Sequence, residues 1–341
     1  MAAKKAPRPA VIADVAKLAG VSVPTVSRVL TGAARVRPEK ERRVLDAIAQ
    51  LNYRPSATAR ALASRQSHTI AIIAGNTSQY GYAETIRGVE EEARADGYTV
   101  TITVVETTDP DEVERAVALV LDQSPAGVVV LKFDPPGVAV LTSLPRDIPI
   151  VAVSGVKSRD VPQAVLDESR AAEALTEHLL SLGHRTVHHV RVPPSRREDG
   201  RTTGWRRALK RAGVEPPELY EATWAPESGR VIGKEIAHNP GVTAVFCGND
   251  EIAMGVIKGL RDAGLSVPED VSVVGFDDHP LAAMWSPALT TVRQDFGGLG
   301  ARAFELLRGA MSGEVVRRTS SALPELVIRE SSAAPRPLAE S

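Results

Sequence analysis

The sequence contains few of the residues and segments that mark secreted or membrane proteins. It has one cysteine in 341 residues, so an internal disulfide is impossible, and Cys247 follows an apolar run, as a small buried side chain would. No apolar stretch approaches the roughly 20 residues of a membrane-spanning helix, and the charged amino terminus lacks the apolar segment of a signal peptide. These absences predict a cytoplasmic protein with no membrane partner.

The usual sequence marks of a cofactor, metal or catalytic site are also missing. No glycine-rich dinucleotide or phosphate loop follows the first predicted strands. His184, His188 and His189 surround one predicted strand, but alternation along a strand sends them to opposite faces, which disfavours a metal site. No cysteine or serine has a base placed beside it. We therefore predict no cofactor, no metal and no catalytic residue.

Length and charge divide the chain into parts. At 43% hydrophobic and 24% charged residues the chain should fold, and 341 residues are too many for one core, so two or three domains are expected. The net charge of −1 gives no support to a nucleic-acid partner. However, residues 1–66 hold 13 basic and four acidic side chains, a net charge of +9, and the other 275 residues carry −10. DNA phosphates would attract the basic segment.

Three short helices are predicted in this basic segment. Residues 12–19 place apolar side chains on one face and end at Gly20, which suits the left-handed conformation of a helix end. A second helix follows with Ser22 as its cap and Pro24 in its first turn, and a third begins at Pro38. The predicted core residues of the third helix are Val44, Leu45, Ile48 and Leu51.

The first two helices and their tight turn match a helix-turn-helix, whose second helix enters the major groove of DNA. Thr25, Ser27 and Arg28 are its polar positions. Arg28 can donate two hydrogen bonds to guanine O6 and N7. The alternative is an ordinary helical bundle with a solvated basic face. The alanine-rich residues 56–64 form helix readily but lack an apolar face, so they would be helical only when held by a partner; a plain linker is the alternative.

DVAKLAGVSVPTVSRVL, followed by NYRPSATARALASRQSHTIAII, resembles the DNA-binding head and hinge of the lactose/galactose-repressor (LacI/GalR) family of bacterial transcription regulators. The resemblance implies that the hinge helix orders on operator DNA and that Leu62 wedges into the central base step from the minor groove. It also implies phosphate contacts from Ser22, Thr25 and Tyr53. The implied base-edge contacts are Val23, Pro24 and Arg28, and Ser27 and the hinge residue Ala59 complete the predicted DNA-binding set. Because Val23 and Pro24 have no side-chain hydrogen-bonding groups, Arg28 would carry most of the direct base readout.

From residue 67 onward, predicted strands and helices alternate. Strands that are apolar throughout indicate a parallel sheet covered by helices on both faces. The predicted strands are 68–73, 99–105, 127–131, 149–153, 187–190, 244–247 and 271–275. The predicted helices are 83–96, 111–122, 169–182, 204–212, 226–238 and 251–263. The body is therefore predicted to be an α/β structure of two doubly wound lobes.

Polar and aromatic residues at the ends of these strands are the predicted ligand site, since such sheets bind ligands beyond the carboxyl ends of their strands. The candidates are Arg201, Trp224, Asn249, Asp277, Gln294 and Phe296. They suit a carbohydrate, because carboxylates and guanidinium groups bind vicinal hydroxyls in pairs and aromatic rings stack on a pyranose. Asp250 and Asp278 could equally be helix caps, and Trp224 could be a core residue.

AVFCGNDEIAMGVIKGLRDAGLSVPEDVSVVGFDDHPLA, with ALTTVRQDF after it, resembles the effector domain of the same family, as does R-x-x-G-W at 201–205. The resemblance implies periplasmic-binding-protein-like lobes in which Arg201, Asn249 and Asp277 bind the effector. Trp224, Gln294 and Phe296 match pocket positions of sugar-responsive members. Gln79 and Tyr82 match a ligand-contacting loop, although residues 76–82 depart from the family's commoner Asn-Pro-Phe-Phe pattern.

These features together predict a dimeric repressor of carbohydrate-utilisation genes that binds a palindromic operator and is released by a sugar or glycoside. The expected parts are a helix-turn-helix head (1–54), a hinge (55–66), a first lobe (67–166 and 293–322), a second lobe (167–292 and 323–331) and a tail (332–341). The tail has no leucine heptads, so a homodimer is expected. The rival interpretations are a transport-type sugar-binding protein and a carbohydrate-acting enzyme. The basic head opposes the first, and neighbouring acidic groups that point apart oppose the second.

Overall fold

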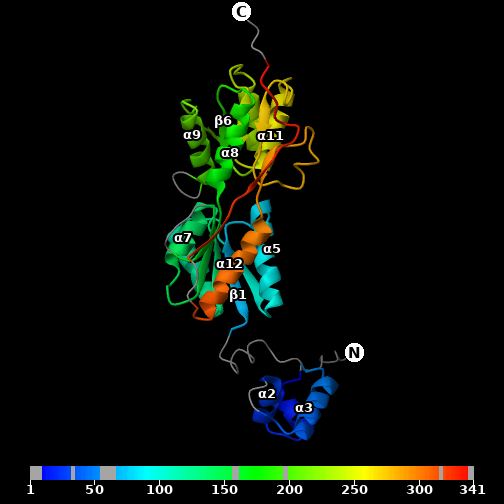
Figure 1. Ribbon diagram of the computed structural model, residues 1–341. Coiled ribbons are helices and arrows are strands. Elements are labelled where there is room, and N and C mark those ends of the chain that lie inside the picture. The colour runs from blue at the N-terminus through cyan, green and yellow to red at the C-terminus, as the bar shows by residue number, and fades with distance from the viewer. Residues whose placement is uncertain are drawn as a thin grey trace, which may run out of the picture. The chain divides into compact units, whose positions relative to one another are not determined.

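The computed structural model describes residues 10–31, 35–53, 67–155, 161–194, 199–314 and 318–336 (Figure 1). The chain divides into two compact units, Met1–His68 and Thr69–Ser341. Ala59 and Leu62, the two hinge residues predicted to meet DNA, lie outside the described residues. In the part of the chain that is described, no helix is both long enough and apolar enough to span a membrane.

The first unit consists of α1 (Ile12–Ala19), α2 (Val23–Thr31) and α3 (Pro38–Gln50). Gly20 ends α1 with φ +62°, and its position lets the Val21 N–H donate to the Ala16 carbonyl, as the sequence predicted. The shared core consists of Val15, Ala16, Ala19, Val26, Val44, Ala47 and Tyr53. The predicted burial of Leu45 is wrong: the side chain is 52% exposed, because it lies about 100° around α3 from the buried Val44.

The first lobe of the second unit is built on a parallel sheet with strand order β11-β5-β4-β3-β1-β2. Its strands are β1 (Thr69–Ala74), β2 (Thr99–Val104), β3 (Gly127–Leu131), β4 (Ile150–Ser154), β5 (Gln163–Leu166) and β11 (Thr319–Ala322). Alternate strand residues pack against helices on the two faces. One face is covered by α5 (Tyr80–Ala95) and α12 (Phe296–Met311), which lie side by side in Figure 1. The other is covered by α6 (Pro110–Asp122) and α7 (Pro135–Ser143).

The second lobe has a smaller parallel sheet with strand order β7-β6-β8-β9. Its strands are β6 (His188–Arg191), β7 (Tyr220–Glu221), β8 (Ala244–Cys247) and β9 (Ser272–Val274). One face packs against α8 (Glu168–Ser181) and α9 (Gly200–Arg211), and the other against α10 (Pro226–Ile236) and α11 (Asp250–Asp262). The α/β architecture with two doubly wound lobes is therefore confirmed.

The described chain passes between the lobes after β5, after β10 (Thr291–Arg293) and after β11. The last passage leads into β12 (Glu325–Val327), which pairs with β10 in antiparallel fashion. These crossings place the carboxyl ends of strands from both sheets around one region of the molecule. Ligand groups bound there would touch both lobes.

Several elements differ from the sequence predictions. The expectation of a strand buried on both faces fails at β2, an edge strand that leaves Ile102 46% and Val104 45% exposed. The strands β5 and β11 and the helix α7 were not predicted. Helix α12 was not predicted, because its first turn is rich in glycine and weakens the helical pattern. These glycines allow close packing: a Cβ on Gly300 would lie 2.2 Å from the Thr85 carbonyl oxygen of α5.

Candidate functional site

The predicted DNA-reading residues lie along α2 in the first unit. Val23, Pro24 and Arg28 are exposed, whereas Thr25 and Ser27 are half-buried. The Ser22 carbonyl accepts from the backbone N–H groups of Thr25 and Val26, and the hydroxyl oxygens of Ser22 and Thr25 are 2.9 Å apart. Ser22 therefore begins α2, and its hydroxyl orients the Thr25 side chain. Arg28 is exposed on α2 and can act as a long hydrogen-bond donor.

Tyr53, which was expected to contact a phosphate, lies mainly in the core of the first unit. It is 8% exposed and packs with the buried residues of the three helices. Its ring stabilises the helix-turn-helix, so any phosphate contact would involve the small exposed part of the side chain.

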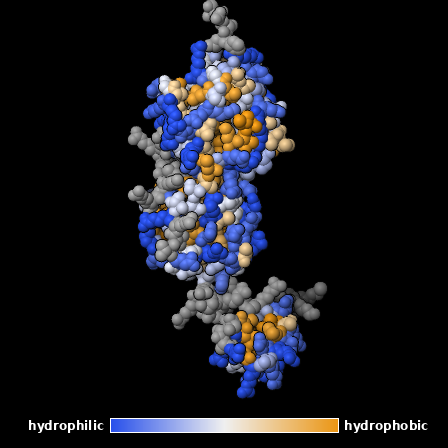
Figure 2. Space-filling model, viewed as in Figure 1, coloured by the Kyte–Doolittle hydropathy of each residue, from blue (hydrophilic) through white to orange (hydrophobic). Residues whose placement is uncertain are grey.

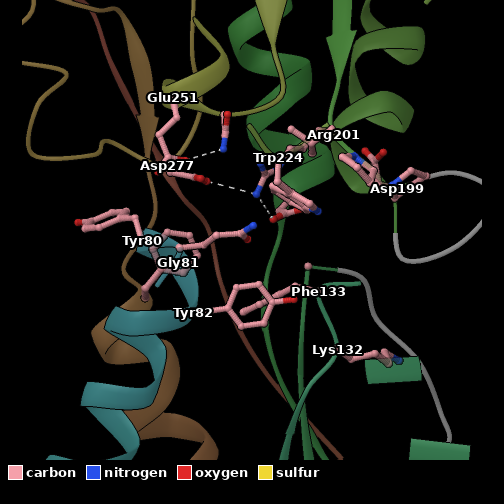
Figure 3. Close-up of a pocket in the computed structure, with 18 residues that line it drawn as sticks. Tyr80, Gly81, Tyr82, Lys132, Phe133, Asp199, Arg201, Trp224, Glu251 and Asp277 are labelled. Atoms are coloured by element: carbon pink, nitrogen blue, oxygen red, sulfur yellow. Dashed lines mark hydrogen bonds and ion pairs between the residues drawn. The ribbon is translucent and has the colours of Figure 1, made fainter. Parts of the chain in front are cut away.

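A cavity lies between the lobes of the second unit and is lined by residues of both (Figure 3). Seven of the eight predicted effector residues line it: Gln79, Tyr82, Arg201, Trp224, Asn249, Asp277 and Phe296. Gln294 does not line the cavity; it is 3% exposed and donates to Asp277 from behind.

Asp277 is presented to the cavity by a strained backbone just beyond β9. Its φ is +113° and that of Asp278 is +54°, in the region that favours glycine. Such conformations cost on the order of 1–3 kcal/mol each and are found mainly at functional sites. The strained segment is held by the neighbouring strand, since the Asp277 N–H donates to the Val292 carbonyl at 2.8 Å.

Arg201 and Gln294 each bridge the carboxylates of Glu168 and Asp277. Arg201 Nη2 lies 2.9 Å from Glu168 Oε1 and 3.2 Å from Asp277 Oδ1. Gln294 Nε2 lies 2.8 Å from Asp277 Oδ1 and 3.4 Å from Glu168 Oε1. Arg201 also donates to the Gly248 carbonyl and stacks on Phe276, with its Cζ 4.6 Å from the ring centroid. Its interactions are therefore with protein groups, and it holds the carboxylates in place.

Burial and neighbouring charges act together on the pKa values of this network. It raises the pKa of Asp277 to about 7, although Arg201 and Gln294 act to lower it. Burial alone would lower the pKa of Arg201, but the charges of Glu168 and Asp277 outweigh it and raise the value above its ordinary range. Desolvation and the charge of Asp277 likewise raise the pKa of Asp250.

Asn249 caps α11, and neither Asp250 nor Asp278 caps a helix. Asn249 Oδ1 accepts from the Ile252 N–H at 2.9 Å, and its Nδ2 donates to Glu251 at 2.8 Å. Asp250 accepts from the Thr291 hydroxyl at 2.5 Å and the His279 N–H at 2.6 Å. The carboxylate of Asp278 pairs with two arginines, Arg293 and Arg329. These aspartates fix the strand ends beside the cavity.

Aromatic rings form the first-lobe side of the cavity. Tyr82 and Phe133 have centroids 5.1 Å apart, and Phe133 and Phe296 6.5 Å apart, all edge to face. The Tyr82 hydroxyl donates to Asp134 at 2.5 Å, so its ring, not its hydroxyl, is the part available to a ligand. Trp224 lines the opposite side of the cavity and also packs against the second-lobe core.

Several lining residues were not among the sequence candidates. They are Tyr80, Gly81, Lys132, Phe133, Gly155, Glu168, Val192, Pro193, Pro194, Asp199 and Glu251. A sequence signal existed for two groups of them: Lys132 and Phe133 directly follow a predicted strand, and Glu251 directly follows Asp250. Glu168 is brought into the cavity by a lobe crossing, which the sequence pattern does not reveal.

Among the described residues, no group of His, Cys, Asp or Glu is arranged to hold a metal ion. His184 hydrogen-bonds Thr243 and the Ala333 carbonyl, and His189 is fully buried against the Phe246 carbonyl. Burial lowers the pKa of His189 to about 4, so this histidine is a neutral core residue.

Comparison with known proteins agrees with this geometry. Residues 11–56 match the family described as bacterial regulatory proteins, lacI family, and residues 176–332 match the periplasmic binding protein-like domain. Catabolite control protein A of Priestia megaterium is 32% identical over 93% of this chain and 97% of its own. The transcriptional repressor PurR of Edwardsiella ictaluri is 34% identical over 94% of this chain and 96% of its own.

Solved structures extend the likeness to the fold. The crystal structure of the Lac repressor dimer bound to operator and the anti-inducer ONPF has a TM-score of 0.87 and 28% identity, covering 96% of this chain and all of that one. The complex of the transcriptional regulator CelR with cellobiose has a TM-score of 0.70 and 27% identity, covering 95% of this chain and all of that one. The chain therefore belongs to the LacI family, and is a DNA-binding transcriptional repressor with an effector-binding domain and not an enzyme.

Proposed function

We propose that this protein is a dimeric repressor of carbohydrate-utilisation genes, and that a saccharide or glycoside bound between its lobes releases it from a palindromic operator. The carrying observation is the cavity itself, which opposes the buried Asp277 and Glu168 to the rings of Tyr82, Phe133 and Phe296. Such a site suits a sugar, because carboxylates accept hydrogen bonds from paired hydroxyls and aromatic rings stack on the apolar C–H groups of the opposite side. The complex of the relative CelR with cellobiose supports this ligand class.

The ligand would act by stabilising one arrangement of the two lobes relative to each other. Phe133 and Phe296 belong to the first lobe and Arg201 and Asp277 to the second, so one bound molecule touches both. A ligand with different affinities for two lobe arrangements shifts the balance between them. We propose residues 55–66 as the hinge that transmits this change, with Ala59 and Leu62 meeting DNA. We also propose the predicted head, lobe and tail boundaries as functional divisions.

A dimer is supported by exposed apolar side chains. On the edge strand, Ile102 and Val104 are 46% and 45% exposed, and Leu119 on α6 is 58% exposed. Figure 2 shows a gathering of hydrophobic residues on the viewed face of the second lobe, near α11. Pairing two chains would cover such surface and place two heads on half-sites about one helical turn apart. A DNA partner in turn supports a cytoplasmic location.

The test uses the full-length chain and DNA selected from a random duplex library. We expect two-fold symmetric sites, a dimer in sedimentation, and affinity that falls linearly with the logarithm of salt concentration. Addition of a panel of mono- and disaccharides should weaken operator binding for at least one member. Selected sites without two-fold symmetry would contradict the dimer. A response to nucleobases or amino acids but to no saccharide would contradict the effector class.

A further inference from the structure

The charged groups that line the cavity are unequal in sign. Four carboxylates, those of Glu168, Asp199, Glu251 and Asp277, face two cations, Lys132 and Arg201. The lining therefore carries a formal surplus of two negative charges. An anionic ligand such as a sugar phosphate or a uronic acid would add to this surplus in a site that is mostly buried.

Arg201 is engaged by protein groups, and Lys132 lies away from the second-lobe carboxylates. Arg201 directs its hydrogen bonds at Glu168, Asp277 and the Gly248 carbonyl, so its charge is already compensated by protein groups. Lys132 is 3% exposed and directly follows β3 in the first lobe. In Figure 3 it lies at the opposite end of the cavity from Glu251 and Asp277.

Acceptor oxygens remain on the second-lobe side. Arg201 and Gln294 approach Glu168 and Asp277 through one oxygen each, Oε1 and Oδ1. Asn249 donates to Oε2 of Glu251. The second oxygens, Asp277 Oδ2 and Glu251 Oε1, have no bond from these donors, and the charge of Glu251 acts on Asp277 strongly enough to raise the pKa of Asp277. Two neighbouring carboxylates form a natural seat for an ammonium group, which has three donors.

Both carboxylates are costly to ionise in the empty cavity. Burial is the main cause that raises the pKa of Asp277 and of Glu251, and the charges of Glu168 and Glu251 raise that of Asp277 further. A bound cation would offset the desolvation of both groups and the repulsion that acts on Asp277. A neutral sugar hydroxyl would supply hydrogen bonds only.

We infer that the effector is a positively charged sugar, with an ammonium group seated between Asp277 and Glu251 and its ring against the aromatic side of the cavity. This inference rests on the proposed function, in that the cavity is taken to bind the effector. It narrows the class from saccharides in general to amino sugars and their glycosides.

The test compares matched ligands by calorimetry on the full-length chain. Each sugar of the panel is used in three forms: neutral, 2-amino-2-deoxy, and uronic acid. We expect the amino form to bind roughly tenfold or more tightly than the neutral form, since hydrogen bonds to charged groups are about twice as strong as neutral ones, and the acid to bind least. In Glu251→Gln the ratio of amino to neutral affinity should approach one. The matched control Glu227→Gln, an exposed carboxylate on α10 outside the cavity, should keep the ratio.

Two outcomes overturn the inference: a neutral form that binds as tightly as its amino form, or an acid that binds most tightly. The first outcome would still be consistent with a saccharide effector. It therefore differs from failure of the proposed function, in which no form of any sugar binds. If no sugar binds, a measurement without ligand tests the charge surplus of the cavity. The thermal midpoint of the empty Glu251→Gln chain at pH 8 should exceed that of the parent chain, because the charge surplus is smaller. A midpoint that is unchanged or lower contradicts the surplus.

Discussion

Replacing Asp277 with asparagine removes a buried charge while keeping the shape of the side chain. Burial raises the pKa of Asp277 from 3.8 to about 7 in the folded chain. Between these values the folded state holds a proton that the unfolded state has released. The associated stability is thus fully present below about pH 3.8 and is lost as the pH rises through 7. At 1.36 kcal/mol per pH unit, the upper limit of this loss is about 4 kcal/mol.

The variant should therefore differ from the parent in a pH-dependent way. Near pH 3.5 Asp277 is mostly protonated in both the folded and the unfolded parent, so the two free energies of unfolding should nearly agree. By pH 8 the variant should gain up to about 4 kcal/mol relative to the parent, because only the parent must ionise a buried group. Urea unfolding followed by tryptophan fluorescence measures this, since all three tryptophans lie in the second lobe.

Glu325→Gln provides the control, because the Glu325 side chain is 71% exposed and its carboxylate is not desolvated by burial. Its difference from the parent should stay small at every pH. The reasoning is refuted if the Asp277→Asn difference is independent of pH, or if the variant loses stability as the pH rises. The latter would mean that the ion pair with Arg201 outweighs burial and that Asp277 is ionised at low pH.

Three further outcomes are expected. Arg28→Ala should weaken operator binding by about 1–3 kcal/mol and relax preference at one base position, as fluorescence anisotropy on base-substituted operators would measure; unaltered discrimination would remove Arg28 from base readout. Gly88→Ala should lower the thermal midpoint, at a cost of about 1–3 kcal/mol, because its Cβ would lie 2.1 Å from the Gly297 carbonyl oxygen; an unchanged midpoint would contradict the close contact of α5 and α12. His189→Gln should flatten the stability profile between pH 4 and 6.5, where the parent loses about 3 kcal/mol as the pH falls, because the unfolded chain takes up a proton that the buried, neutral imidazole does not; equal profiles would count against this.

Most of the fold could be predicted from local pattern. β3 and β8 match their predicted ranges, because each is a short apolar run between turn residues. α9 begins four residues before its predicted start, because Asp199 caps it and the polar first turn gives no apolar signal. α12 was missed since its glycines serve packing against α5, a tertiary requirement that lowers local helix propensity.

The lining residues of the cavity could be predicted where they lie at strand ends or in family signatures, as do Arg201, Asn249 and Asp277. They could not be predicted where the geometry depends on distant segments. Glu168 lies at a crossing between the lobes, and this crossing places it beside the cavity. Gln294 lies behind Asp277 because Asp277 pairs with Arg293, the residue directly before Gln294. The strained φ of Asp277 also has no sequence signal, since aspartate there looks like any residue after a strand.

We propose that this chain has two separable sites, one that reads DNA and one that receives a sugar. The most direct test measures operator affinity of Arg28→Ala and Asp277→Ala, each with and without the saccharide that weakens binding by the parent chain. We expect Asp277→Ala to keep operator affinity and to lose the response to the saccharide. Arg28→Ala should bind operator weakly and still bind the saccharide. A response to the saccharide that survives in Asp277→Ala would contradict the account.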